Sequence, residues 1–215
     1  MLPTQALPEI LPPNPLVLAA EWLAEATRRG DQPNPNAMVL ATCDKAGHPA
    51  ARVVLCKEIQ PEPGLLRFYT NYDSRKGREL TAWPRAAVVL HWDHLHRQVR
   101  VEGCVRRTTA ADSDQYFASR HRESQLGAHA SLQSQPVESR ALLQHRLDEV
   151  SAHFAGRDVP RPQHWGGFEL WAETVELWVE GAARLHDRAR WTRRVDVGPD
   201  GPRAAGPWSA TRLHP

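Results

Sequence analysis

Three potential cations recur at alternate positions near the C-terminal end, Arg184, His186 and Arg188, separated by Leu185 and Asp187. Side chains alternate faces on an extended strand, so this spacing predicts that the three cations share one face. Positive charges that close repel one another, and phosphates, carboxylates or electron-rich cofactor rings are their usual partners. A solvated basic edge strand explains the same pattern, and for this motif alone it is the better explanation. We expect Asp187, on the opposite face, to serve folding or dimer packing.

A second group, Ser74, Arg75 and Lys76, follows an apolar stretch and opens a predicted helix. Free backbone N–H groups and the helix dipole favour negative charge at a helix N-terminus, so a phosphate would fit there. A solvated helix cap with exposed basic residues fits these three residues equally well.

A third group, Tyr116, Arg120 and Ser124, is spaced four residues apart and would lie on one helix face if the helix extends that far. A phenol, a guanidinium and a hydroxyl together suit a phosphomonoester, although a surface stripe is the other interpretation. Arg52 and Lys57 enclose an apolar run and would face opposite ways on a regular strand. Taken alone, they are the charged ends of an ordinary strand.

Other chemistries find little support in the sequence. Gln98 lies on the polar face of a predicted strand, and that face suits either solvent or a pocket. His91, His94 and His96 lack helical spacing and an evident carboxylate or thiolate partner, so we expect no metal site. The motifs of covalent hydrolases and of doubly wound nucleotide-binding folds are absent from the sequence.

Apolar periodicity predicts the elements that must position these groups. Helices are expected at 16–29, 74–83, from Thr109 onward and at 138–155, and strands at 38–43, 50–58, 65–71, 86–92, 97–107, 167–180 and 183–194. Ser74 and Thr109 suit N-cap positions, and Gly30 suits the end of the first helix. Many short strands with few, separated helices indicate a mainly β fold of the α+β class, an antiparallel barrel or meander with helices outside.

The composition sets further limits. With 215 residues, 41% of them hydrophobic, the chain can form one domain at 15–215 after a proline-rich arm at 1–14 that we expect to be flexible. The balance of 27 basic against 25 acidic residues is poor for a nucleic-acid binder. No apolar run nears the ~18 residues of a membrane span, and no signal peptide is evident. Cys43, Cys56 and Cys104 favour buried reduced thiols in a cytoplasmic protein over disulfides or zinc.

Nine segments together resemble the pyridoxamine/pyridoxine 5′-phosphate oxidase family, in order and over about residues 15–215. They are R-V-V-L-C-K (52–57), F-Y-T-N-Y-D-S-R-K (68–76), R-Q-V-R-V-E-G (97–103), Y-F-A-S-R-H-R-E-S-Q-L-G-A (116–128), S-L-Q-S-Q (131–135), W-G-G-F (165–168), E-L-W (176–178), R-L-H-D-R (184–188) and R-L-H-P (212–215). Each segment is weak alone, and the nine in register are very specific.

The resemblance implies an FMN-binding split β-barrel that works as a homodimer, with each flavin held between subunits. The residues that it assigns to FMN are Arg52, Lys57, Tyr69, Thr70, Ser74, Arg75, Lys76, Gln98, Gln133, Ser134, Trp178 and Arg188. The residues that it assigns to the substrate phosphate are Lys57, Tyr116, Arg120 and Ser124. Arg184 and His186 match the catalytic positions that pack against the substrate's pyridine ring.

The implied reaction oxidises pyridoxamine or pyridoxine 5′-phosphate to pyridoxal 5′-phosphate, with dioxygen as acceptor and hydrogen peroxide as product. Lys57 as a point charge and Arg120 as a fork suit the phosphate dianion of such a substrate. One departure concerns substrate closure, because residues 7–13 read L-P-E-I-L-P-P where the family commonly carries Arg-Arg-x-Tyr. Two alternatives remain, a related oxidase of phenazine precursors and a non-catalytic barrel that binds flavin or pyridoxal phosphate.

Overall fold

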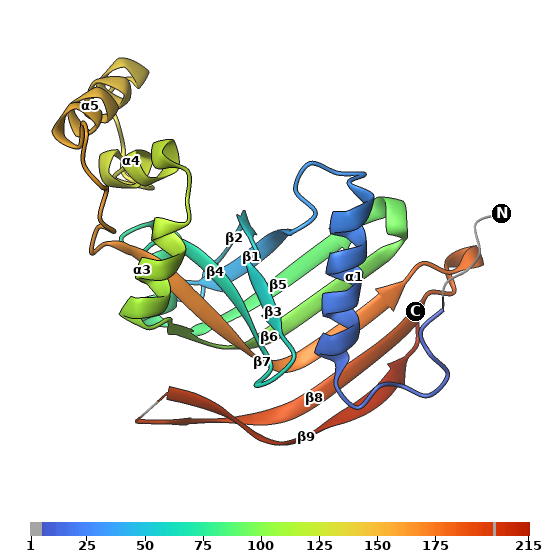
Figure 1. The fold of residues 1–215 in the computed structure, drawn as a ribbon. Coiled ribbons are helices and arrows are strands. Elements are labelled where there is room, and N and C mark those ends of the chain that lie inside the picture. The colour runs from blue at the N-terminus through green and yellow to red at the C-terminus, as the bar shows by residue number, and fades with distance from the viewer. Residues whose placement is uncertain (1–5, 200) are drawn as a thin grey trace.

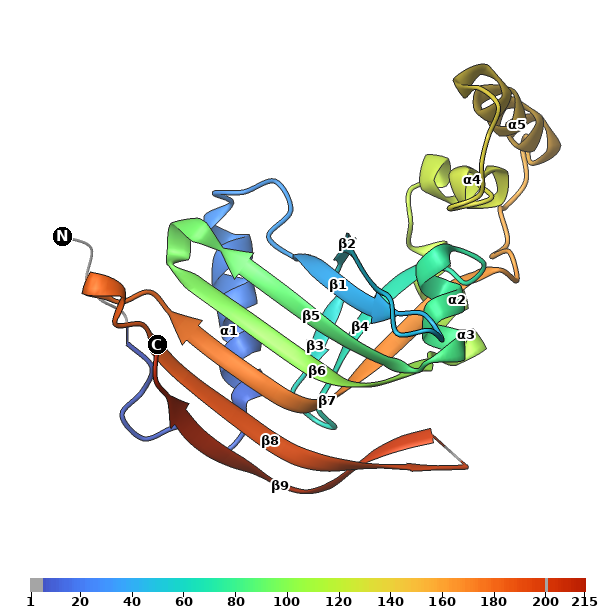
Figure 2. The same cartoon turned by 180° about the vertical axis from the view of Figure 1, so that it is seen from behind.

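The computed structural model describes residues 6–199 and 201–215, which form one curled antiparallel sheet with α-helices around it (Figures 1 and 2). Its strands are β1 (Ala37–Cys43), β2 (Pro49–Leu55), β3 (Glu58–Gln60), β4 (Leu65–Asn71), β5 (Arg85–Trp92), β6 (Arg97–Arg107), β7 (Trp165–Val179), β8 (Asp187–Gly198) and β9 (Gly201–Leu213). Its helices are α1 (Pro15–Arg29), α2 (Arg75–Ala82), α3 (Ala110–Ala118), α4 (Arg122–Ala130) and α5 (Arg140–His153), with short 3₁₀ turns η1 (Asp93–Leu95) and η2 (Ala182–Arg184). The predicted mainly β fold with flanking helices is confirmed.

The long strand β7 organises the sheet. The strand order is β2-β1-β5-β6-β7-β4-β3, and β8 and β9 continue from β7. β6 pairs with β7 through most of its length, whereas β4 pairs with the first part of β7 and β8 with the last part. One edge of β7 is therefore divided between β4 and β8, and the sheet curls into a half-barrel that is split along this edge.

A core of alternate strand side chains fills the concave side of the sheet. Phe68 on β4, Val99 on β6 and Leu177 on β7 are completely or almost completely buried there. α1 lies across the open side of the curl (Figure 1) and adds Leu16 and Trp22 to the same core. Burying one such side chain stabilises the fold by about 1.5–3 kcal/mol, so α1 contributes to the barrel as well as covering it.

The ends of several helices follow the predicted capping chemistry. The side chains of Ser74 and Thr109 accept the N–H groups of Gly77 and Asp112 at the starts of α2 and α3. Gly30 ends α1 with a φ of 66°, a left-handed conformation that glycine adopts without strain. These local signals therefore placed three element boundaries correctly.

The C-terminal quarter differs from the prediction. The strand expected at 183–194 begins only at Asp187, because residues 182–184 form the turn η2. The strand β8 then continues to Gly198 and pairs with β9, a strand of 13 residues for which no element was predicted and which contains Pro202 and Pro207. The prolines lie in a strand that pairs with β8 alone among the described residues, where a missing N–H is tolerated.

Two other predicted elements are interrupted. The strand expected at 50–58 ends at Leu55, and the separate strand β3 begins at Glu58. The helix that starts after Thr109 stops at Ala118, and α4 begins at Arg122. Both interruptions matter for the candidate site, because Lys57 lies in the first break and Arg120 in the second.

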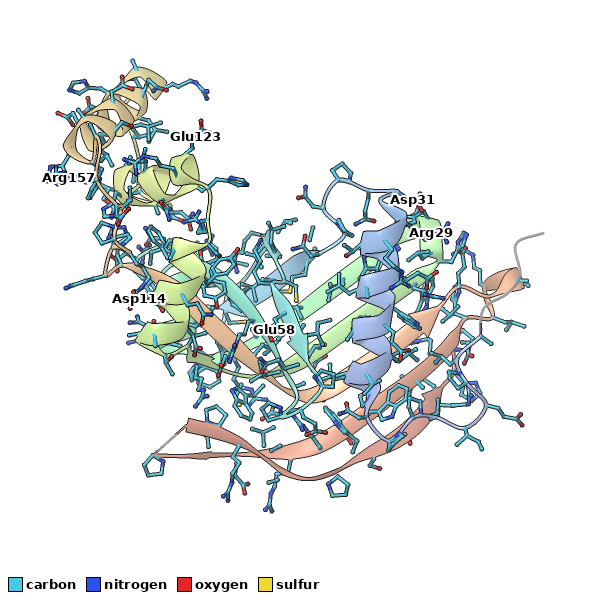
Figure 3. The ribbon with its side chains drawn as sticks, viewed as in Figure 1. Arg29, Asp31, Glu58, Asp114, Glu123 and Arg157 are labelled. Carbon is cyan, nitrogen blue, oxygen red and sulfur yellow. The ribbon has the colours of Figure 1, made fainter. Side chains whose placement is uncertain are left out.

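The helices α3, α4 and α5 gather at one end of the sheet, and α5 projects away from it (Figure 1). Figure 3 labels Glu123 on α4 and Arg157 just after α5. Arg122 connects α4 to the end of α5 through the backbone oxygens of Arg157 and Phe154, at 2.9 and 2.6 Å. None of the helices in the described part of the chain has the length and apolar character that a membrane span requires.

Residues 6–14 of the N-terminal arm, for which we expected flexibility, lie against β8 and β9. The backbone N–H of Leu7 donates to Asp187, and the indole of Trp191 donates to the Pro12 oxygen at 2.8 Å. The Leu7 side chain is only 4% exposed and belongs to the main core. The described part of the arm is therefore packed on the barrel.

Candidate active site

A pocket of about 560 Å³ lies where the break after β2, the strand β4, the start of α2 and the helices α3 and α4 meet. Its lining residues are Val53, Val54, Leu55, Lys57, Tyr69, Thr70, Lys76, Tyr116, Ser119, Arg120, His121, Ser124, Gln133 and Trp165. Three of these side chains are cationic, and none of the described lining residues is Asp or Glu. Uncompensated positive charge in a concave site is suited to an anionic ligand.

Stacked aromatic rings form one wall of this pocket. Tyr69 and Tyr116 stack at 3.9 Å between ring centres, and Trp165 continues the stack at 5.6 Å from Tyr69. The Arg120 guanidinium lies 4.6 Å from the centre of the Trp165 ring, and Lys57 Nζ lies 5.8 Å from that of Tyr116. The wall supports two of the three cations by cation–π contact and leaves their donors free for a ligand.

Arg120 provides the sharpest evidence for an absent anion partner. Within the described part of the chain its Nη1 atom is buried and has no hydrogen-bond partner. Burial lowers the pKa of Arg120, although a guanidinium stays charged at neutral pH. A buried donor that lacks an acceptor is unfavourable, so this nitrogen is ready to bind an anion in the pocket.

The expectation that Tyr116, Arg120 and Ser124 share one continuous helix face is wrong. Tyr116 belongs to α3 and Ser124 to α4, while Arg120 lies in the turn between them. The Gln125 amide holds this turn by donating to the backbone oxygen of Phe117 at 2.9 Å. The three side chains nevertheless line the same pocket.

The start of α2 supplies the third cation. Ser74 is completely buried, and its hydroxyl donates to the Asn71 oxygen while accepting the Gly77 N–H, so it holds the helix start in place. Lys76 Nζ extends into the pocket and donates to Gln133 Oε1 at 2.6 Å. Burial and the nearby Arg52 lower the pKa of Lys76 to about 8.

The neighbouring arginines differ from Lys76 because they already have a carboxylate partner. Glu79 contacts Arg52 at 3.2 Å and Arg75 at 2.7 Å, and Thr42 donates to the same carboxylate. Burial would raise the pKa of Glu79, but the hydrogen bonds from Thr42 and Arg75 hold it below its ordinary value. Arg52, Arg75 and Glu79 thus form a fixed charged layer behind Lys76.

The loop after α4 closes the same side of the pocket. Thr70 donates to Gln133 Oε1 at 3.3 Å, which joins β4 to this loop. Ser134 has a φ of 72°, a conformation that residues with a side chain rarely adopt. Such backbone persists where the surrounding structure determines it, and here it orients the Gln133–Ser134 pair beside the start of α2.

The remaining predicted residues form a second cluster, on β6, β7 and β8. Gln98, Trp178 and Arg188 are neighbours across these strands, since Gln98 pairs with Trp178 and Trp178 pairs with Arg188. Arg188 forms an ion pair with Glu176 at 2.8 Å, and the His186 ring lies 4.7 Å from that of Trp178.

The prediction that Arg184, His186 and Arg188 share the face of one strand is wrong. Only Arg188 lies on β8, whereas Arg184 belongs to η2 and has a φ of 63°. Arg184 is exposed at this turn, and His186 reaches the cluster through its contact with Trp178. A tight turn before the strand, not strand alternation, therefore presents the two residues.

The two clusters lie at opposite ends of β7. Thr70 pairs with Gly166 near the start of this strand, and Trp178 lies twelve residues further along it. That separation corresponds to about 40 Å along a β-strand. One copy of the chain therefore cannot place both clusters around one small ligand, and a second copy would be needed.

Two family models match consecutive parts of this chain, and the second is described as a dimerisation region. Residues 25–154 match the family described as "Pyridoxamine 5'-phosphate oxidase", and residues 165–215 match the "Pyridoxine 5'-phosphate oxidase C-terminal dimerisation region". The curled sheet is the split barrel of flavoprotein oxidoreductases. The chain belongs to the pyridoxamine 5′-phosphate oxidase family.

Individual relatives support the assignment at different levels. A Burkholderia thailandensis protein named pyridoxine/pyridoxamine 5′-phosphate oxidase is 49% identical over 203 residues, covering 94% of this chain and 90% of the relative. The structure of PhzG from Burkholderia lata, in complex with tetrahydrophenazine-1-carboxylic acid, gives a TM-score of 0.84 at 28% identity and covers 98% of this chain and 100% of that one. An FMN-binding protein from Nostoc punctiforme shares the fold, with a TM-score of 0.67 at 15% identity over 96% of this chain and 99% of that one.

Sequence reasoning missed several pocket residues. Trp165, Ser119 and His121 line the pocket, although no role was predicted for them. Ser119 and His121 flank Arg120 and lie within a motif that was recognised, so proximity in sequence was an available signal. Trp165 also begins a recognised segment, W-G-G-F, but its contact with Arg120 depends on how β7 meets the turn after α3.

Proposed function

We propose that the protein is an FMN-dependent oxidase that converts pyridoxamine 5′-phosphate and pyridoxine 5′-phosphate to pyridoxal 5′-phosphate. The observation that carries this proposal is the pocket with three cations, no acidic lining residue in the described chain and an unpaired buried nitrogen on Arg120. A phosphate monoester dianion satisfies all three features at once.

The cofactor's own phosphate fits the start of α2. Among the described residues Lys76 has no carboxylate within ion-pair distance, and Arg52, Ser74 and Arg75 hold the helix start that presents it. Thr70 and the Gln133–Ser134 pair would contact the flavin from the same copy of the chain. Bound FMN would supply the redox chemistry, a hydride equivalent passing from the substrate to dioxygen, which is reduced to hydrogen peroxide. With the amine substrate, water would hydrolyse the oxidised imine and ammonia would leave.

The substrate phosphate would be bound by Lys57, Tyr116, Arg120 and Ser124. Two of these are cations, and two carry hydroxyl groups that donate to phosphate oxygens. Their positions on two helices, on the turn between those helices and in one strand break give a fixed geometry, which would hold the ring end of the substrate in place.

Arg184 and His186 would complete the site from a second copy of the chain, together with Gln98, Trp178 and Arg188. The family match at residues 165–215 supports a homodimer, since that region is described as a dimerisation region. His186 and Arg184 would orient the pyridine ring, and His186 is the side chain suited to proton handling near neutral pH. The free cysteines, with Cys56 and Cys104 buried, suit a cytoplasmic location.

A second candidate function is oxidation of a phenazine precursor. The similarity to the PhzG structure, with a TM-score of 0.84, favours this alternative. Phenazine-type carboxylic acids lack a phosphate ester, so Lys57, Tyr116, Arg120 and Ser124 would not be needed together. A barrel that binds flavin or pyridoxal phosphate without turnover is the third possibility.

One experiment separates these functions. The purified, FMN-loaded protein is given pyridoxamine 5′-phosphate, unphosphorylated pyridoxamine or a reduced phenazine carboxylic acid, and hydrogen peroxide release is measured. We expect release with the phosphorylated substrate and much less with the other two. A preference for the phenazine compound would favour the second function, and flavin binding without peroxide from any substrate would favour the third.

A further inference from the structure

The turn η2, which carries Arg184, has an unfavourable backbone conformation. Ala183 and Arg184 have φ values of 53° and 63°, so two consecutive residues with side chains are left-handed. Such residues occur singly and rarely, and a pair of them persists only where flanking contacts hold it. The contacts on each side of the turn therefore determine where Arg184 and His186 lie.

Gly181, which precedes the turn, contacts two residues that follow it, Leu185 and His186. A Cβ atom on Gly181 would lie 1.8 Å from the Leu185 oxygen, so only glycine allows the chain to fold back this closely. The Gly181 N–H donates to His186 Nδ1 at 3.3 Å, which ties the two arms of the turn together. The His186 ring also packs against Trp178.

The contacts after the turn converge on Asp187, the first residue of β8. One carboxylate oxygen accepts the Leu7 backbone N–H at 2.8 Å, and the other pairs with Arg212 on β9 at 2.7 Å. Arg212 also donates to the Pro8 oxygen at 2.8 Å. Three distant segments, the N-terminal arm, the start of β8 and the end of β9, are therefore joined at one carboxylate.

We propose that Asp187 is a positioning residue, which fixes the turn carrying Arg184 and His186 by anchoring it to the N-terminal arm and to β9. The meaning of that turn for catalysis rests on the proposed function. Asp187 lies between His186 and Arg188 in the chain, but its side chain contacts Leu7 and Arg212. Loss of the carboxylate charge would release the end of the turn and leave Arg188 in its β-strand pairing.

The test compares four forms of the full-length, FMN-loaded protein by amide hydrogen exchange and by kinetics. They are Asp187→Asn, Arg212→Met, the double variant, and the control Asp196→Asn. Asp196 is a suitable control because it lies on the same strand, is exposed and pairs with Arg194 of that strand.

We expect residues 182–188 to exchange about tenfold faster in Asp187→Asn and in Arg212→Met, while β4 and α1 remain protected as in the wild type. The double variant should behave like either single variant, because both changes break the same junction. The value of kcat/KM for pyridoxamine 5′-phosphate should fall about tenfold with FMN affinity unchanged. The control should match the wild type in every measurement.

Other results would overturn the proposal. Unchanged exchange at residues 182–188 would show that Asp187 does not hold the turn, whatever the activity. Faster exchange throughout the sheet would show that Asp187 only stabilises the fold. If exchange rises at the turn alone while the wild type oxidises no phosphorylated pyridine, the anchoring is upheld and the proposed function fails.

Discussion

Arg120 combines two properties that are unfavourable in a folded protein without a ligand. Its guanidinium is partly buried beside Trp165, and one of its nitrogens has no acceptor in the described chain. Burial of a charged donor without a partner costs free energy, and binding of an anion recovers it. The site is thus prepared for its ligand at some expense to the fold.

The first prediction concerns this residue. Arg120→Ala should weaken pyridoxamine 5′-phosphate binding by roughly 1.5–3 kcal/mol, about 10- to 150-fold, because charge-assisted hydrogen bonds to the phosphate are lost. Arg120→Lys should fall in between, since it keeps the charge but not the fork. Calorimetric titration of each variant provides the measurement, and Arg203→Ala, at an exposed position on β9, is the control. Equal affinities of wild type and Arg120→Ala would remove Arg120 from the site.

The second prediction concerns Lys76 and pH. The pKa of Lys76 is about 8 before a ligand binds, and an adjacent phosphate dianion favours the charged amine. FMN binding should therefore take up a proton above pH 8, and FMN affinity should fall as pH rises through this value. Fluorescence titration of FMN between pH 7 and about 10 measures the effect.

Two variants check that this pH dependence belongs to Lys76. Lys76→Met should bind FMN more weakly at pH 7 and lose most of the decline above pH 8, because no amine titrates there. Lys45→Gln, in the turn between β1 and β2, should retain the wild-type profile. A Lys76→Met protein that keeps the full decline would show that another group causes it.

At the scale of elements, the pocket depends on close packing of β4 against β7. Gly167 pairs with Tyr69, and a Cβ atom at this position would lie 2.8 Å from the Tyr69 ring and 2.7 Å from the Thr108 side chain. Glycine at this position therefore lets the stacked aromatic wall approach the strand.

The third prediction follows from this contact. Gly167→Ala should displace the Tyr69 ring, lower the melting temperature and reduce substrate affinity, because Tyr69 supports Tyr116 in the stack. Thermal unfolding and steady-state kinetics measure the two effects. Gly198→Ala, where a Cβ atom would meet nothing within 4 Å, should change neither. Normal stability and kinetics in Gly167→Ala would mean that the wall has room to shift.

Most elements could be predicted from the sequence because their signals are local. Alternating apolar residues located β1 and β4 to β7, and the capping residues Ser74 and Thr109 located two helix starts. The break at Ser119–Arg120 has no comparable signal, since the contact that spans it is a hydrogen bond from the Gln125 side chain to the Phe117 oxygen.

The candidate site was predictable only in part, because residue types are visible in the sequence and tertiary contacts are not. The residues predicted to bind phosphate were chosen by type and family resemblance, but their meeting in one pocket depends on tertiary structure. The turn η2 was missed because a left-handed backbone is usually signalled by glycine, and here Ala183 and Arg184 adopt it. The separation of the clusters, twelve residues or about 40 Å along β7, could not be read from sequence, because it depends on which strands pair with β7.

At the scale of the whole molecule, the pocket and the Arg184–His186 turn lie too far apart to serve one ligand within one chain. The proposed homodimer resolves this by combining the pocket of one copy with the turn of the other. In such an arrangement each active site needs residues from both copies, and two variants that are impaired in different residues can test this.

The fourth prediction is that these variants complement each other. At a substrate concentration well below the wild-type KM, Arg120→Ala and His186→Ala should each retain only a small fraction of wild-type activity. After unfolding and refolding as an equal mixture, about half of the dimers contain one of each, and each of these has one intact site, which gives about a quarter of wild-type activity. Peroxide release with pyridoxamine 5′-phosphate is the measurement. Mixing either variant with itself is the control, and a mixture as inactive as its components would place both residues in a site within one chain.

The prolines of β9 have a consequence beyond this chain's own fold. β9 pairs with β8 alone in the described chain, and 13 residues of unpaired strand edge would offer a template for strands of other molecules. Pro202 and Pro207 interrupt the row of N–H donors along β9, and Arg203 and Arg212 add like charges that repel an identical neighbour. These prolines and arginines thus discourage open-ended stacking of the protein into fibrils.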